Sequence, residues 1–135
     1  MASKISSDDV FTLSKSFHDM AVTVGNYRFD HWDQLTSAQR SRLESEQWTL
    51  LNTSSDLNAQ SVLLKIQAME SELQTLQGAA AAMTSVANKL DSIKKALTVA
   101  ASAVAFGASL YMAGSTMNLD AAIAAANNLV GAIQA

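Results

Sequence analysis

The sequence contains no proline and no cysteine, and it has few glycines and few aromatic residues. Proline is the strongest helix breaker, so its absence from 135 residues permits long helices almost anywhere. The absence of cysteine excludes disulfides, thiolate metal sites and cysteine nucleophiles, and it leaves the redox compartment open. Aromatic residues make up only 6% of the chain, and alanine supplies much of its 49% hydrophobic content. This composition favours helices that approach one another closely.

Charge is also sparse. Charged residues make up 16% of the chain, against about a quarter in typical soluble domains. A net charge of −3 and the lack of a basic stripe argue against a nucleic-acid partner, because lysine and arginine hold phosphates. The first residues show no apolar run followed by a small-residue cleavage site, so we expect no Sec-type signal peptide. Cytoplasmic residence, export by a specialised route and membrane association all stay open.

Apolar residues recur at alternating steps of three and four, which predicts helices that pack lengthwise. One seam runs from Val10 to His31, and a series of leucines follows at Leu43, Leu50, Leu57 and Leu64. N-caps are predicted at Ser6 or Ser7 and at Thr36 or Ser37. We therefore expect one domain over residues 1–135: an all-α, elongated antiparallel bundle of about four helices with coiled-coil-like seams. The expected helices cover residues 7–34, 37–77, 79–113 and 118–134.

The boundary at Gly78 admits two structures. A helical hairpin at Gly78 and one long helix through it both fit the apolar spacing. We predict the hairpin, because a continuous helix from Ser37 to Ala113 would be about 115 Å long, too long for a compact domain. The stretch Asn52–Asp56 is the weakest helical part, since its side chains compete for their own backbone. The uninterrupted leucine spacing nevertheless favours a continuous helix there.

One segment is unusual because no residue between Lys95 and Asp120 is charged. As a helix, residues 96–114 would be about 28 Å long, close to the roughly 30 Å of a bilayer's hydrocarbon core. Alanine, serine, glycine and threonine dilute its larger side chains, which makes insertion borderline. Residues 121–133 repeat this composition, so the two segments form an uncharged hairpin. Its candidate membrane or interface residues are Leu97, Val99, Val104, Phe106, Gly107, Leu110, Tyr111 and Met112, and the candidate charges at its entrance are Lys89, Lys94 and Lys95.

Three readings fit this hairpin. It is the buried centre of a bundle, a membrane segment released at a lipid surface with its lysines at the headgroups, or a subunit contact through small-residue faces. In composition, the hairpin resembles the Ala- and Gly-rich hydrophobic hairpin of colicin-type and other α-helical pore-forming toxins. The chain also resembles, in composition, proteins exported by specialised bacterial secretion machines. These resemblances imply a class of mechanism and no residue roles.

Candidate chemistry is scarce. His18 and His31 are thirteen residues apart, which does not match the i, i+4 pairs of helical zinc sites. Two glutamate pairs, Glu44 with Glu46 and Glu70 with Glu72, have a spacing that points their side chains in different directions. No nucleophile elbow or phosphate-binding glycine loop is present. We expect no enzyme activity, no cofactor, no metal and no small-molecule substrate.

The large aromatic residues gather around the first turn. Trp32 and Trp48 flank it, and Tyr27 and Phe29 lie nearby. We predict a local core plug where the first two helices meet. The alternative is a partner-binding patch or an interfacial membrane anchor, because aromatic side chains favour both settings.

These observations predict a non-enzymatic, membrane-active or pore-forming helical protein or toxin component, whose apolar hairpin inserts or oligomerises. The alternative is a soluble oligomerising adaptor, chaperone, or filament or assembly subunit, in which the hairpin is buried as core or subunit interface. The expected partners are other protein chains, either copies of this chain or a companion subunit, and a lipid membrane.

Overall fold

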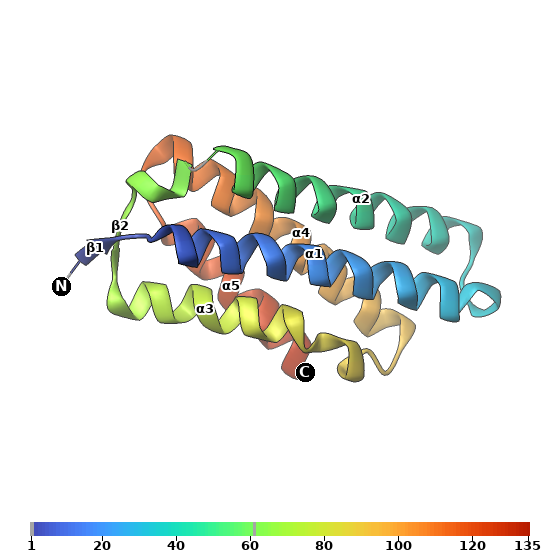
Figure 1. Cartoon of the computed structure of the whole chain (residues 1–135). Coiled ribbons are helices and arrows are strands. Elements are labelled where there is room, and N and C mark those ends of the chain that lie inside the picture. Colours follow the sequence, from blue (N-terminus) through green and yellow to red (C-terminus); the bar gives the residue numbers. More distant parts are fainter. Residues whose placement is uncertain (1, 61) are drawn as a thin grey trace.

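The chain is all-α, with helices that lie lengthwise beside one another (Figure 1). The computed structural model describes residues 2–60 and 62–135. In this part of the chain the α-helices are α1 (Ser7–Asp30), α2 (Ser37–Gln60), α3 (Glu70–Thr84), α4 (Ile93–Thr116) and α5 (Asp120–Gln134). The three-residue strand β1 (Ala2–Lys4) precedes α1. The connections between the helices hold the 3-10 helices η1 (Trp32–Gln34), η2 (Val62–Lys65) and η3 (Val86–Lys89) and the three-residue strand β2 (Gln67–Met69).

Successive helices reverse direction, but not all neighbours in space are antiparallel (Figure 1). α1 and α2 are antiparallel and share two short bonds, in which each of Ser14 and Ser54 donates its hydroxyl to the other's carbonyl at 2.7 Å. α3 packs beside α1, with Gln77 bonded to Asp9, and these two helices run in the same direction. About four antiparallel helices were expected. The described chain instead has five, and some neighbouring helices are parallel.

Local hydrogen bonds define where the first two helices begin. The Ser6 hydroxyl accepts a bond from the backbone N–H of Asp9 at 3.1 Å, and the Asp9 carboxylate accepts one from the Ser6 N–H at 3.2 Å. Thr36 and Gln39 make the same reciprocal pair before α2, at 3.1 and 2.8 Å. Each pair satisfies N–H groups that a helix start leaves without partners. The predicted caps at Ser6 and Thr36 are confirmed.

The helix expected over residues 37–77 is wrong in its second half. α2 ends at Gln60, Ser61 lies outside the described residues, and the chain continues through η2 and β2. β1 pairs with β2 in antiparallel register, and the Ile5 N–H donates to the Ile66 carbonyl at 3.2 Å. Both isoleucine side chains are buried. The pairing joins residues 63 (Lys4 with Gln67) to 67 (Ala2 with Met69) positions apart, so local spacing along the chain does not reveal it.

The turn expected at Gly78 is also wrong. α3 passes straight through Gly78, which has open space around it. The reversal lies instead between Ser85 and Ser92, whose hydroxyl caps α4 by accepting from the Lys95 N–H at 3.1 Å. A helix tolerates one interior glycine at a cost of about 1 kcal/mol, so glycine alone does not end it. The expected helices over residues 7–34 and 79–113 accordingly become α1, ending at Asp30, and α4, beginning at Ile93.

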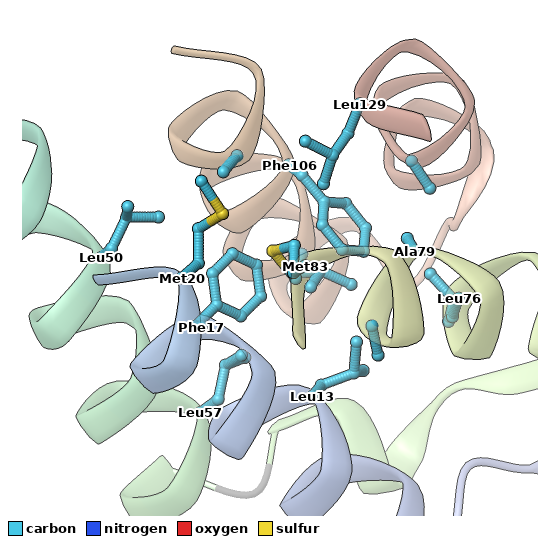
Figure 2. Close-up of a cluster of buried hydrophobic side chains, with 14 of the residues drawn as sticks. Leu13, Phe17, Met20, Leu50, Leu57, Leu76, Ala79, Met83, Phe106 and Leu129 are labelled. Atoms are coloured by element: carbon cyan, nitrogen blue, oxygen red, sulfur yellow. The ribbon is translucent and has the colours of Figure 1, made fainter. Parts of the chain in front are cut away.

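The core lies between α1 and α4, with the other helices around them (Figure 2). The rings of Phe17 and Phe106 stand 5.5 Å apart, centroid to centroid, and both side chains are fully buried. Six residues of the predicted α1 seam form a buried stripe, which comprises Val10, Leu13, Phe17, Met20, Val24 and Tyr27, whereas His31 is half-buried just beyond the end of α1. α4 packs against α1, α2 and α5. A helix that is covered on several sides must be apolar on several sides, which explains the composition of α4.

Candidate interaction surface on the C-terminal hairpin

The structure divides the eight candidate residues of α4 by burial. Four are core residues: Val99, Phe106, Gly107 and Leu110. Leu97 and Val104 are half-buried. Tyr111 is 50% exposed and Met112 is 58% exposed. Only these last two offer a large apolar surface to a partner while the fold is intact.

Gly107 is where α4 lies closest to its neighbours. A Cβ atom at this position would stand 2.8 Å from Thr53 Cγ2 on α2 and 3.2 Å from Phe17 Cε1 on α1. Carbon atoms pack at about 3.5–4.0 Å, so no larger residue fits without movement. The small-residue faces of this segment were expected to allow close helix approach, and at Gly107 the approaching helices belong to the same chain.

The seam between α2 and α4 opens into a groove beside Gly107. The groove has a volume of about 390 Å³. Its lining is mostly apolar, with one carboxylate, and includes Asp56, Leu57, Val104, Tyr111 and Met112. Spacing along a single helix does not reveal such a groove, because its two walls come from different helices.

The outer surface of the hairpin carries little charge. On α4 the exposed positions in the uncharged stretch include Ala105 and Ala108, and on α5 they include Ala121, Ala124, Asn127 and Asn128. The inward face of α5 is a buried stripe that consists of Ala122, Ala126, Leu129 and Ile133. The fold therefore covers one side of the hairpin and leaves the other side as a neutral, small-residue surface.

α4 is also the one helix, within residues 2–60 and 62–135, that is long and apolar enough to cross a membrane. Its most apolar window has a mean hydropathy of 1.6, and 44% of that window is buried inside the fold. A core helix of a soluble protein has the same length and composition, so this property alone does not separate the two readings.

The three predicted entrance lysines lie near the start of α4. Lys89 and Lys94 are exposed, and the Lys95 ammonium donates to the Ala135 carbonyl at 2.8 Å. This bond ties the beginning of α4 to the last residue after α5. The base of the hairpin is thus basic, whereas its tip lies at the opposite end of the bundle (Figure 1).

The tip of the hairpin gathers exposed apolar side chains. Tyr111 and Met112 are in the last turns of α4, and Met117, which follows α4, is 52% exposed. Met117 has a left-handed backbone, with φ 57° and ψ 33°. After it the Asn118 side chain accepts from the Asp120 N–H at 2.8 Å and starts α5. Asp120 is the one charged residue of this tip.

The histidines and glutamates considered for chemistry are dispersed. Within the described part of the chain, no three His, Asp or Glu side chains gather as a metal site. His18 is exposed, whereas His31 stacks on Tyr27 with ring centroids 3.9 Å apart. Glu44 pairs with Arg28 at 3.1 Å. Burial raises the pKa of Glu46, and Arg42 only partly offsets this effect.

The expected aromatic core plug is wrong for three of its four residues. Tyr27 is buried, but Phe29, Trp32 and Trp48 are exposed. Phe29 lies in α1 but outside its buried stripe, and Trp32 follows the end of α1 in η1, so neither ring fills the space between the helices. Leu35 and Leu43 are buried near this turn in their place.

No protein-family model matches the chain, and no curated protein or solved structure matches it either.

Proposed function

We propose that this chain is a non-enzymatic, membrane-active helical protein whose α4–α5 hairpin leaves the bundle and enters lipid. The observation that carries the proposal is the stretch of α4 after Lys95, which is uncharged. It has exposed Tyr111 and Met112 near an apolar hairpin tip and lysines at its base. The α1–α2 pair, with its leucine spacing, is proposed as a coiled-coil-like seam that remains folded as the soluble body.

The energetic balance of release depends on the solvent that receives the hairpin. Phe106, Val99 and Leu110 are fully buried in the bundle, and each contributes about 1.5–3 kcal/mol by leaving water. Release into water would lose this free energy, whereas release into hydrocarbon keeps the same side chains away from water. A lipid surface therefore removes most of this penalty. The uncharged stretch contributes no ion to desolvate, and Asp120 remains the one charge that opposes entry of the tip.

A reversible lock tests whether the hairpin must leave. The natural chain has no cysteine, so Thr53→Cys with Gly107→Cys introduces a single pair. A Cβ at 107 would lie 2.8 Å from Thr53 Cγ2, so the side chains at the two positions are close enough for an S–S bond of about 2.05 Å. We expect the oxidised protein to cause no dye release from vesicles, and the reduced protein to recover it. Equal leakage in both states would refute release.

A surface charge gives an independent test. Ala105 is exposed on α4, so Ala105→Glu leaves the soluble fold intact but adds about 2.5–3.5 kcal/mol at a bilayer centre. Leakage should fall by roughly a hundredfold. Ala81→Glu is the matched control, because Ala81 is exposed on α3. If both variants leak like the natural protein, the hairpin does not insert.

A second function is favoured by the groove between α2 and α4, where exposed Tyr111 and Met112 offer a contact for another chain. In that case the protein is an assembly subunit or adaptor. Light scattering in buffer and in mild detergent separates the two functions. A defined oligomer in buffer that Tyr111→Ser disperses, without any flotation on vesicles, would favour the subunit. A monomer that becomes a ring-sized species in detergent would favour the membrane function.

A further inference from the structure

The connection between α1 and α2 is built around one tryptophan. The guanidinium carbons of Arg28 and Arg40 stand 5.0 and 4.6 Å from the centre of the Trp32 ring. Arg40 also donates two bonds to the Trp32 carbonyl, at 2.9 and 2.6 Å, and Arg28 donates one to the Arg40 carbonyl at 3.2 Å. Ring, backbone and both cations are therefore fixed relative to one another.

The contacts with Arg28 and Arg40 explain the position of Trp32, but they do not explain why Phe29 is exposed. Phe29 is 79% exposed, the largest exposed fraction among the large hydrophobic side chains of the described chain. Trp32 keeps 43% of its surface exposed beside it. A role of Trp32 in stabilising the turn gives no reason for Phe29 to be exposed to water as well. Transfer of the Phe29 side chain out of water is worth about 1.5–3 kcal/mol.

The same end of the bundle is the least negative part of the molecule. We call it the turn end: it holds the α1–α2 connection and the η3–α4 connection (Figure 1), and Lys94 lines the same surface as Gln34 and Thr36. Its six basic residues are Arg28, Arg40, Arg42, Lys89, Lys94 and Lys95, and its five acidic residues are Asp30, Asp33, Glu44, Glu46 and Asp91. The remaining sequence has three basic and seven acidic residues.

We propose that the turn end is a membrane-interface anchor, with Phe29 and Trp32 at the glycerol level of an anionic lipid surface and the neighbouring cations at its phosphates. Aromatic rings beside Arg or Lys are typical of that depth, because the rings prefer the interface while the cations remain hydrated. Arg40 holds the Trp32 carbonyl with two of its N–H groups, but within the described residues no carboxylate pairs with it, so its positive charge is not neutralised.

This inference rests on the proposed function and adds an order of events. Docking by the turn end places the base of the hairpin, at Ile93 and Lys94, against the headgroups before α4 leaves the bundle. Adsorption should therefore not require release. The locked protein, with Thr53→Cys and Gly107→Cys oxidised, should bind vesicles without causing leakage.

Tryptophan fluorescence on this locked protein tests the anchor. Trp48→Phe leaves Trp32 as the only tryptophan, and Trp32→Phe leaves Trp48, which is 60% exposed on α2. With vesicles of phosphatidylcholine and phosphatidylglycerol, we expect Trp32 emission to shift to the blue and to be quenched by lipids brominated near the headgroup. Trp48 emission should not change. A shift of Trp48 without a shift of Trp32, or no binding to vesicles at all, would overturn the anchor.

Two matched phenylalanines give the affinity test. Phe29→Ser should weaken vesicle binding at least about tenfold, whereas Phe11→Ser should leave it unchanged. Phe11 is 60% exposed but lies near the opposite end of α1. Equal losses in both variants would refute a specific anchor. Leakage by the reduced protein without a Trp32 shift would overturn the anchor alone, and a Trp32 shift without leakage would overturn the proposed function alone.

Discussion

Replacing Gly107 by alanine tests the close packing of α4 against α2 and α1. In an open helix, Gly→Ala stabilises by about 1 kcal/mol, because alanine restricts the unfolded chain and favours the helix. At Gly107 the added methyl would stand 2.8 Å from Thr53 Cγ2, 3.1 Å from Thr53 Oγ1 and 3.2 Å from Phe17 Cε1. The gain in propensity and the clash therefore act in opposite directions.

The neighbours of Gly107 have little freedom to move. Thr53 is β-branched and stiff about χ1, and its hydroxyl donates to the Thr49 carbonyl at 3.0 Å. Phe17 is fully buried against Phe106. Overpacking of such a site costs about 1–3 kcal/mol. Subtracting the helical gain leaves a net loss of about 1 kcal/mol, or roughly 4 °C in Tm for a chain of this size.

Urea denaturation followed by circular dichroism provides the assay, with two internal controls. Gly78→Ala and Gly131→Ala add a methyl where nothing lies within 4 Å, so each should raise the free energy of unfolding by about 0.5–1 kcal/mol. Thr53→Ser removes the nearest of these atoms and should reduce the loss that Gly107→Ala causes in the double variant. If Gly107→Ala alone stabilises as much as Gly78→Ala, the close approach of α4 to α2 is refuted.

Three other outcomes are expected. Asp120→Asn should increase vesicle leakage, because it removes the one charge at the hairpin tip, and Asp56→Asn should not; equal effects would contradict tip entry. Met117→Gly should raise the free energy of unfolding by about 1 kcal/mol in a urea titration, since φ 57° is strained for a side chain and free for glycine. Burial raises the pKa of Glu46, so the charged carboxylate destabilises the fold at pH values above the ordinary pKa of glutamate, and this effect is absent in acid. Glu46→Gln should therefore raise the free energy of unfolding at neutral pH but not near pH ~3. An increase that is the same at both pH values would contradict this.

Some features of this protein follow from the sequence alone because their causes are local. The absence of proline and the three-and-four spacing predict helices, and both signals act within one or two turns. Ser6 and Thr36 cap helices by bonding residues three positions ahead, so their role can be predicted from the residues beside them. The buried stripe of α1 from Val10 to Tyr27 is likewise a property of one helix.

Only the tertiary structure decided the features that depend on distant residues. The segment before α3 is not helical but pairs as a strand with residues 2–4, far away in the sequence. Gly78 remains helical, and the reversal falls at Ser85–Ser92. Large apolar side chains of α4 lie on both its buried and its exposed sides, so composition does not show that Phe106 faces the core while Tyr111 faces water. Neighbouring helices set that division, since side-chain burial depends on which surfaces meet across the bundle and not on spacing along one helix.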